Sequence, residues 1–546
     1  MSRIGRLTRR TFLIGSAAIG GGVAFGYYRY KQPLPNPLLD HLAGGEAALT
    51  PFVKIDAEGV TLITPRAEMG QGVTSLQAYL LAEELDVDPL KVRLDPGRPS
   101  PAYYNSAVLA EGLPFAATDT GWLAEQARAF TDVPARLLGM QITGGSSTVP
   151  DMFDRLRHAG AVARETLKEA AAQQTGIARD RLGTDDGAVL LPDGKRLPYT
   201  ALAPRAATLE PVTEVSLRPE TAWRYIGKRV QRTDIVAKST GTERYGIDMA
   251  LDGMLYASVR ANPGIGGFVN GIESGAAEGM RGVQQVVPVT GGVGVIADNT
   301  WRAFQAVNAI EVTWGAPAYP ATSGEMWQAL ADAMTAEHRD SRFRDDGDVE
   351  NALFEGEAIE AGYRVPYLAH APLEPMNATV LVTDTRADIW TGTQIPRFVQ
   401  QHAAKLTGLD DRAVHVHVLP MGGSFGRRLE DVHVMQAVEL AMAVKGRPVK
   451  LTWTREEDMA HDFPRPMQIA RARGTVRNGK VEALDLSVVS QSVTASWMGR
   501  MMVAPPGPDI TIVAGAWDQP FAIPHYRVTG YRAPEMVPVS SWRSVG

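Results

Sequence analysis

The sequence predicts an α+β protein of several domains. Its 546 residues correspond to roughly three to four domains at about 150 residues each. Segments with strand-like alternation and segments with helical spacing occur without the regular β/α alternation of a doubly wound sheet. Glycine supplies 54 residues, so many loops are expected to need a positive φ or a close approach of the backbone.

The composition excludes several classes of protein. Hydrophobic residues make up 45% of the chain and the net charge is −6, which excludes a disordered chain. No second long apolar run follows the N-terminus, which argues against a polytopic membrane protein. The 55 Lys and Arg are outnumbered by 61 Asp and Glu, which argues against nucleic-acid binding. The absence of cysteine excludes disulfides, thiolate metal ligands and cysteine-bound iron–sulfur clusters in this chain, so such a cluster would lie in a partner.

The N-terminus has the pattern of an export signal. Arg9 and Arg10 precede Phe12, and a Gly- and Ala-rich apolar stretch runs from Leu13 to Phe25. This order is typical of a bacterial twin-arginine signal, and it predicts a periplasmic protein that is exported after folding. The segment lacks a clear A-x-A cleavage site, which leaves an uncleaved membrane tether open, although the apolar run is short for a full span.

The remaining chain is divided by changes in composition and pattern. The predicted regions are a signal at 1–30, a Pro- and Gly-rich linker at 31–50, a domain at 51–229, a small α+β domain at 230–316, a charged connector at 317–360 and a final domain at 361–546. Within the first domain the patterns predict a hairpin over 52–64, a helix over 74–85 and a helix over about 151–174 that ends at Gly176.

The second half of the chain has equally clear signals. A helix is expected over about 301–308, and a hairpin is expected from strands at 378–384 and 387–390. Pro396 predicts the start of a helix. A strand over 413–419 leads through a loop into a helix over about 429–444. Asn478 and Gly479 predict a type I′ turn in another hairpin.

Three glycine-containing loops are similar in composition and in position relative to a helix. They are Met69–Gly72, Thr143–Thr148 and Gly422–Gly426, and each lies just before a predicted helix. Backbone N–H groups in such loops, together with a helix N-terminus, form a favourable site for an anion. The three loops therefore predict a site for a large phosphate-bearing cofactor, although a simple tight turn explains each loop equally well on its own.

Two further patterns suggest different chemistry. Gly422–Gly426 is also a G-x-S-x-G sequence after a strand, so a serine hydrolase with Ser424 as nucleophile is an alternative hypothesis. Its triad would need Asp458 or Asp509 with His461 or His525, and the following Arg427 and Arg428 suit a phosphate better than an acyl pocket. His415 and His417 lie on one face of a strand and could form half of a metal site, but no third ligand has a clear spacing.

Several motifs together resemble a known family. They are Glu68–Gly72, Thr240–Tyr245 with Gly253–Tyr256, His370–Asn377 with Thr391–Gln394, Gly422–Gly426 and Trp542–Gly546. In this order they resemble the molybdenum-binding subunits of the xanthine dehydrogenase/aldehyde oxidase family. The resemblance covers residues 50–546 and points to the exported large subunits of isoquinoline 1-oxidoreductase and related aldehyde dehydrogenases. It implies molybdopterin-binding domains and an α/β hammerhead domain at 230–316.

The resemblance also implies a cofactor, a reaction and a partner. The cofactor would be molybdopterin with molybdenum, as the cytosine dinucleotide, with no metal ligand from the protein. The reaction would be oxidative hydroxylation of an N-heterocycle or an aldehyde, with water as the oxygen source and electrons passed to a small [2Fe-2S] subunit. Gln394 would be the amide near the metal. The residues implied in cofactor binding are Gly70, Gln71, Gly72, Gly145, Ser146, Gly422, Gly423, Phe425, Gly426 and Arg543.

The chain departs from the family pattern at its end. The family's general base is a glutamate in a loop near the C-terminus, and Glu374, Glu430 and Glu535 do not match its motif. We therefore expect a truncated or split subunit, in which the base is missing. A non-catalytic, truncated cofactor-binding domain is the third hypothesis for function.

Overall fold

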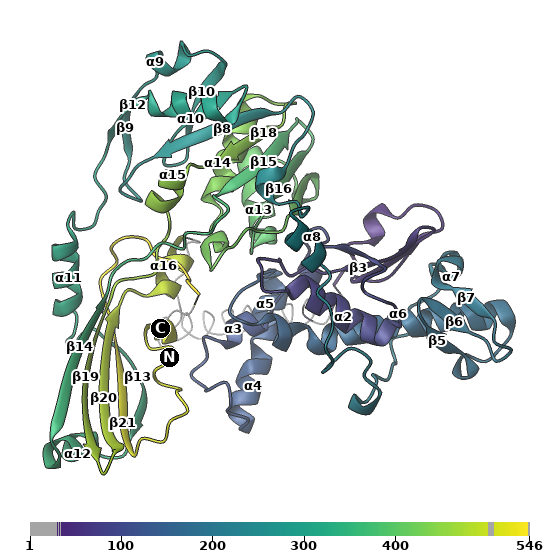
Figure 1. The fold of residues 1–546 in the computed structure, drawn as a ribbon, viewed down its shortest axis with the longest axis horizontal. Helices are drawn as coiled ribbons and strands as arrows, with labels where there is room; N and C mark the ends of the chain where they lie inside the picture. The colour runs from purple at the N-terminus through teal and green to yellow at the C-terminus, as the bar shows by residue number, and fades with distance from the viewer. Residues whose placement is uncertain (1–29, 31, 33, 501–506, 544–546) are drawn as a thin grey trace, which may run out of the picture.

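The computed structural model describes residues 30, 32, 34–500 and 507–543 of the chain. It confirms the α+β class and the multi-domain organisation, because separate sheets carry separate hydrophobic cores (Figure 1). The predicted signal at 1–30 lies almost entirely outside the described residues. No helix of the described part is long and apolar enough to cross a membrane.

The first unit is built on a four-stranded sheet in the order β1-β2-β3-β4. Its strands are β1 (Ala47–Thr50), β2 (Val53–Asp56), β3 (Gly59–Ile63) and β4 (Arg93–Asp95). A small sheet contains β5 (Gly183–Asp185), β6 (Ala188–Leu190) and β7 (Arg196–Pro198), and the helices are α2 (Val73–Leu85), α6 (Thr148–Thr175) and α7 (Tyr199–Ala206). The predicted hairpin and both predicted helices are confirmed, and α6 ends at Gly176 with a φ of 73°. The segment predicted as a linker, 31–50, ends in the strand β1.

Helices α2 and α6 cross closely at a glycine. A Cβ on Gly160 would lie 2.4 Å from the Leu81 carbonyl oxygen, so only glycine allows this approach. Between β4 and α6 the chain forms three short helices, α3 (Ala107–Ala110), α4 (Trp122–Phe130) and α5 (Asp132–Leu138).

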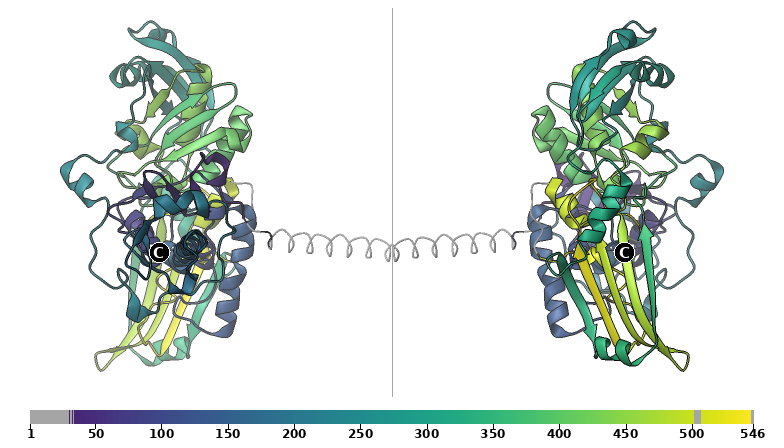
Figure 2. Two further views of the ribbon diagram at one scale, coloured as in Figure 1. Left: turned by 90° about the vertical axis from the view of Figure 1, so that its right-hand side faces the viewer. Right: turned by 90° about the vertical axis from the view of Figure 1, so that its left-hand side faces the viewer.

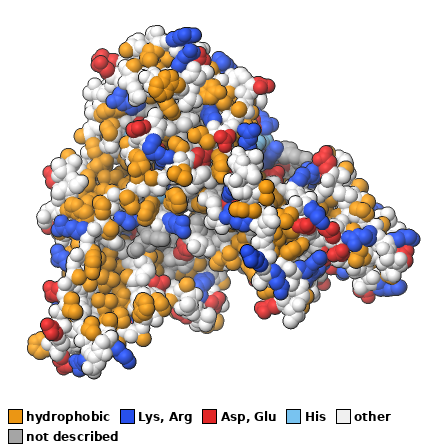
Figure 3. All heavy atoms as spheres, in the orientation of Figure 1, with side chains coloured by type: hydrophobic (Ala, Val, Ile, Leu, Met, Phe, Trp, Pro, Cys, Tyr) orange, Lys and Arg blue, Asp and Glu red, His pale blue; other side chains and the backbone are white. Residues whose placement is uncertain are grey.

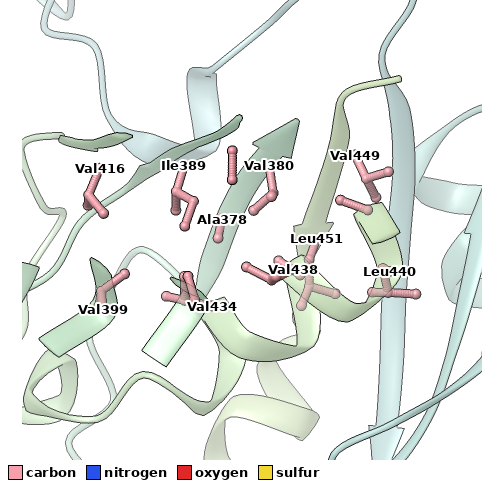
Figure 4. Close-up of a cluster of buried hydrophobic side chains, with 14 of the residues drawn as sticks. Ala378, Val380, Ile389, Val399, Val416, Val434, Val438, Leu440, Val449 and Leu451 are labelled. Atoms are coloured by element: carbon pink, nitrogen blue, oxygen red, sulfur yellow. The ribbon is translucent and has the colours of Figure 1, made fainter. Parts of the chain in front are cut away.

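The second unit is a seven-stranded mixed sheet in the order β10-β11-β8-β18-β15-β16-β17. The strands are β8 (Leu255–Ala261), β10 (Val283–Val289), β11 (Gly292–Ala297), β15 (Asn377–Val382), β16 (Ala387–Thr391), β17 (Val414–Val418) and β18 (Val449–Thr452). Its helices are α10 (Thr300–Asn308), α13 (Pro396–Thr407) and α14 (Val432–Ala443). Side chains of β15–β18 interleave with those of α13 and α14 in one apolar core (Figure 4). The helices predicted at 301–308, from Pro396 and near 429–444, the hairpin at 378–390 and the strand at 413–419 are confirmed.

The region at 230–316 is less separate than predicted. Leu255 and Ala257 of β8 pair in parallel with Val449 and Leu451 of β18, so the predicted boundary near 316 does not divide two sheets. Strands β9 (Val269–Glu273) and β12 (Glu311–Trp314) form their own two-stranded ladder. The assignment of this region as a hammerhead domain stays a prediction.

The third unit is a five-stranded sheet in the order β13-β21-β20-β19-β14. The strands are β13 (Arg339–Asp346), β14 (Ala358–Val365), β19 (Gln468–Arg477), β20 (Lys480–Ser490) and β21 (His525–Arg532), and α11 (Ser323–Asp332) and α12 (Val349–Glu355) flank them. The type I′ turn is confirmed, since Asn478 and Gly479 have φ of 53° and 74°. Figure 3 shows apolar side chains gathered over this sheet on the face in view, whereas charged side chains are frequent over α6 and α7.

The predicted connector at 317–360 is therefore wrong. This segment supplies β13, α11, α12 and the start of β14. Charged residues lie on both faces of β13, whereas in β14 the residues Ile359, Ala361, Tyr363 and Val365 alternate with polar or small ones although nearly every side chain is exposed. The period-two pattern that marks a strand is therefore absent from β13 and present only in β14, at the end of the segment.

Candidate functional site

Four loops from distant parts of the sequence meet at one place. The N–H of Ala67 donates to Thr143 Oγ1 at 2.9 Å, and the N–H of Thr143 donates to the Gln394 carbonyl oxygen at 2.9 Å. The N–H of Met421 donates to the Glu68 carbonyl oxygen at 3.0 Å. The segments 67–72, 143–148, 391–394 and 421–428, which we call the loop cluster, thus bring together the motifs that the sequence singled out.

Gln394 lies at the centre of the loop cluster. Its side chain is 2% exposed, its Nε2 donates to the Thr143 carbonyl oxygen at 2.7 Å, and its Oε1 accepts from Ser424 Oγ at 2.5 Å. The helix α13 begins two residues later with Pro396 at its first turn, which fixes the backbone here. A primary amide has two N–H donors, so one remains available to a ligand.

The loop 422–426 presents unused backbone donors. Phe425 and Gly426 have φ of 58° and 111°, and a Cβ on Gly426 would lie 1.9 Å from the Ser541 carbonyl oxygen. Among the hydrogen bonds of the described residues, none uses the N–H groups of residues 423–426. The N–H of Arg543 donates to the Phe425 carbonyl oxygen at 2.7 Å, so the predicted C-terminal loop does lie beside this one.

The loop before α6 has the same property. Gly145 and Ser146 are consecutive residues with φ of 58° and 51°, and no hydrogen bond in the described chain uses the N–H groups of residues 144–146. Ser147, at the N-cap of this 28-residue helix, makes no side-chain cap bond. Free N–H groups at the start of a long helix are a favourable environment for a phosphate. The donor set of the loop 423–426 therefore fits a phosphate-bearing cofactor, whereas at Gly145 the N–H groups lie next to the carboxyl group of Glu111, whose pKa is raised to about 7 by burial.

The loop 68–72 is arranged differently. The Glu68 carboxylate accepts from the N–H groups of Gly70, Gly72 and Thr74 at 2.9–3.2 Å, so it caps α2. Gln71 uses its Oε1 for the N–H of Met69 and its Nε2 for the Ala67 carbonyl oxygen. This loop satisfies its own polar groups, and the cofactor contacts predicted for Gly70, Gln71 and Gly72 stay predictions.

A buried ion pair lies beneath the loop 422–426. Arg428 is fully buried, and its Nη2 lies 2.9 Å from Glu374 Oε2. The same carboxylate accepts from the N–H of Gly422 at 2.7 Å, and its Oε1 accepts from the N–H of Ile247 at 3.0 Å. Burial lowers the pKa of Arg428, while the Glu374 charge opposes that shift. Glu374 therefore holds the loop 422–426 in position through its contacts with Gly422 and Arg428.

Arg427 belongs to a second buried cluster. Its Nε lies 3.3 Å from Asp462 Oδ1 and 3.5 Å from Asp458 Oδ1. Asp462 also lies 2.8 Å from His370 Nδ1, and His370 Nε2 lies 2.9 Å from the Ser541 carbonyl oxygen. The suggestion that Arg427 and Arg428 hold a phosphate is therefore wrong, because both are buried in ion pairs of the protein. The sequence showed His370 and Glu374 only as parts of a motif, since their partners are distant in the chain.

His433 adds a titratable group to this interior. It is buried between Arg427, Arg428 and the ring of Trp453, and neither ring nitrogen has a hydrogen-bond partner among the described residues. Burial first, and then the two arginine charges, lower its pKa well below the usual value. The folded protein therefore binds fewer protons than the unfolded chain below about pH 6.5, and stability falls as the pH falls.

We expect His433→Leu to flatten the pH dependence of stability between about pH 6.5 and 5, because one proton-linked contribution of at most about 1.4 kcal/mol per pH unit disappears. Denaturant unfolding at a series of pH values measures this slope independently of any constant loss of stability. His158→Leu, on the exposed side of α6, is the control and should keep the slope of the original chain. Identical slopes for all three proteins would contradict the assignment.

The two other chemical patterns find no support. Ser424 is fully buried, and its hydroxyl bonds Gln394 and the N–H of Arg428 rather than an imidazole. His417 lies 2.9 Å from Asp388 and stacks on Trp390. The described residues contain no group of three His, Asp or Glu side chains arranged to hold a metal. Neither a serine hydrolase nor a histidine metal site is indicated.

Comparison with known proteins agrees with the motifs. Residues 333–543 match the molybdopterin cofactor-binding domain. The chain is 28% identical to the isoquinoline 1-oxidoreductase subunit beta of Brevundimonas diminuta over 91% of its own length and 65% of the relative. It is 28% identical to the membrane-bound aldehyde dehydrogenase [pyrroloquinoline-quinone] of Gluconacetobacter polyoxogenes over 86% of its own length and 58% of that protein. The chain thus spans less than two thirds of these relatives.

The comparison with solved structures gives partial matches. The aldehyde oxidoreductase of Desulfovibrio gigas matches 64% of this chain and 43% of its own, with a TM-score of 0.46 and 19% identity. The predicted resemblance to molybdenum-binding large subunits is confirmed by the domain match and the curated relatives.

Proposed function

Because the chain resembles the molybdenum-binding large subunits of the xanthine dehydrogenase/aldehyde oxidase family, we propose that it is the cofactor-bearing subunit of a molybdenum hydroxylase. It would hydroxylate an N-heterocycle or an aldehyde, with oxygen taken from water. The observation that carries this proposal is the buried Gln394 of the matched domain, which joins a loop of unused N–H donors in that domain to a second such loop at residues 144–146. When bound, the molybdopterin cofactor would supply the two-electron redox centre.

The chain's own groups would bind and orient that cofactor. The N–H groups of residues 423–426 and 144–146 are the donors, and their spread over two loops suits an extended ligand with phosphates, such as the cytosine dinucleotide form. Gln394 would offer its second N–H to the metal end of the cofactor without adding charge. Glu374 and His370 would hold the loop 422–426 and the segment 541–543 in place, and the burial of this layer would exclude water.

The chain would need a redox partner. It contains no cysteine, so it has no thiolate to hold an iron–sulfur relay. We infer that electrons leave through a small [2Fe-2S] subunit. A tagged chain purified from its natural host should bring down a cysteine-rich protein with an iron–sulfur absorption spectrum. A chain that transfers electrons from substrate to the host's own acceptor without a partner would contradict this.

The reaction can be tested by isotope labelling. The protein, co-purified with its partner, should oxidise isoquinoline or an aldehyde with an artificial electron acceptor, and the product should contain ¹⁸O when the reaction runs in H₂¹⁸O. Incorporation from ¹⁸O₂ instead of water would exclude the proposed chemistry. Boiled protein and a parallel reaction in unlabelled water control for non-enzymatic exchange.

We also propose export to the periplasm, with the N-terminal segment kept as a membrane tether. The support is the order Arg9, Arg10 and the apolar run 13–25. Replacing both arginines with lysine should leave the protein in the cytoplasm, and unchanged export of that variant would refute the assignment.

A further inference from the structure

Helix α4 turns its apolar side away from the protein. Trp122, Leu123 and Phe130 are 76%, 62% and 70% exposed, and Ala124 is the helix's buried side chain. At 100° per residue, Trp122, Leu123 and Phe130 lie within one third of the helix circumference, and Ala124 lies outside that sector. An ordinary surface helix shows the reverse arrangement, because its apolar stripe faces the core.

The polar side of α4 holds it on the protein. Arg128 donates to the carbonyl oxygens of Asp119 and Ala116 at 2.6 and 2.8 Å, and it pairs with Glu125 at 2.8 Å. These contacts join the polar side of α4 to the segment that directly precedes it. On the adjoining α5, Leu137 and Leu138 are also 48% and 64% exposed. We call Trp122, Leu123, Phe130, Leu137 and Leu138 the α4–α5 apolar face.

The chain enters the described structure against α5, on the side of the helix that carries Asp132 and Arg136. The Tyr30 hydroxyl donates to Asp132 of α5 at 2.9 Å, and the Arg136 guanidinium lies 5.4 Å from the centre of the Tyr30 ring. Arg136 also donates to the Gln32 carbonyl oxygen at 2.8 Å. Figure 2 shows the described chain beginning next to α4 and α5. The apolar run 13–25 ends only five residues before Tyr30.

We propose that the α4–α5 apolar face lies in the interface of a lipid bilayer. This inference rests on the proposed retention of the N-terminal tether. The 13 residues from Leu13 to Phe25 are fewer than the roughly 20 that span a bilayer as a helix. A short apolar segment binds weakly on its own, and stable attachment takes a second contact. Tryptophan, phenylalanine and leucine side chains suit the boundary between headgroups and acyl chains.

The position of the tether favours lipid over a protein partner. Tyr30 fixes the entry of the chain on α5, so a tether held in a membrane brings the end of the molecule that carries α4 and α5, rather than the far end at β9, towards the lipid surface. The sequence before Tyr30 contains Tyr27, Tyr28 and Arg29, which are residue types common at membrane interfaces.

The absence of cysteine allows a site-specific test on the full chain. Phe130→Cys, labelled with an environment-sensitive NBD dye, should brighten several-fold with vesicles of phosphatidylcholine and phosphatidylglycerol, and spin-labelled lipid should quench it. Phe268→Cys is the matched control, since Phe268 is 75% exposed and lies next to β9 at the opposite end of the molecule. Its dye should not respond.

Vesicle flotation adds a quantitative measure. Trp122→Ser with Phe130→Ser should lower vesicle binding by tenfold or more, because the face loses two of its large apolar side chains. If the full chain floats but the dye at residue 130 stays silent, the tether holds the protein alone and the proposed face is wrong. If the full chain does not float, the tether proposal fails as well. If the dye responds to protein concentration without vesicles, the face joins two copies and the lipid assignment is overturned.

Discussion

Replacing Glu374 with glutamine should lower the free energy of unfolding by about 3–5 kcal/mol, which is typical when one partner of a buried ion pair is removed. Arg428 would remain fully buried without its ion-pair partner, and the bonds from Gly422 and Ile247 to the carboxylate would weaken. Chemical denaturation, followed by circular dichroism, measures the change. We expect the loop 422–426 to be the part of the cluster most disturbed.

Two controls separate the pair from general effects. Glu350→Gln breaks the exposed pair between Glu350 and Arg527, with Glu350 64% exposed, and should cost about 1 kcal/mol or less. The double variant Glu374→Leu with Arg428→Met removes both charges and should be less destabilised than the sum of the single variants. Additive losses in that cycle would show that the two charges do not act as a pair.

Gln394→Ala should lower kcat by about 10²–10³-fold in the assembled enzyme, since one preorganised donor at a reacting centre is worth this much. The rate is measured per bound molybdenum, so that loss of cofactor and loss of chemistry are counted separately. The substitution also leaves the Ser424 hydroxyl and the Thr143 carbonyl oxygen without their partner. We therefore expect some loss of stability in addition to the loss of rate.

A second buried glutamine provides the control. Gln400 in α13 is 8% exposed and donates to the carbonyl oxygens of Asp411 and Val414 at 3.0 Å, outside the loop cluster. Gln400→Ala should cost stability while kcat per molybdenum stays unchanged. Equal kcat values for Gln394→Ala and the original enzyme would remove Gln394 from the mechanism and leave it a structural residue.

Elements with local signals were predictable from the sequence. A helix start is marked by Pro396, a helix end by Gly176 and a turn by Asn478–Gly479. Each signal comes from the backbone preference of the residue itself. The strand β13 gives no such signal because charged residues lie on both of its faces, and the apolar residues of β14 are exposed rather than buried. The pairing of β8 with β18 joins residues almost 200 positions apart, and no local pattern specifies that neighbour.

The site was predictable in the same partial way. The glycine loops, Gln394 and Arg543 were found by motif, and the structure brings them together. The ion pairs under the loops were not found, because Arg428 and Glu374 are 54 positions apart and a lone charged residue in a sequence carries no mark of burial. Consecutive arginines after a glycine loop resembled an anion site, whereas each one neutralises a carboxylate of the protein.

The central claim is that the loop cluster binds molybdopterin with molybdenum. Its most direct test is the molybdenum and pterin content of the purified chain, produced in a host that makes the cofactor and measured by mass spectrometry of the metal and of the released nucleotide. We predict equimolar molybdenum and a pterin released as its cytosine dinucleotide, with both strongly reduced by Glu374→Gln and retained in Glu350→Gln. A folded chain that contains neither molybdenum nor pterin would contradict the account.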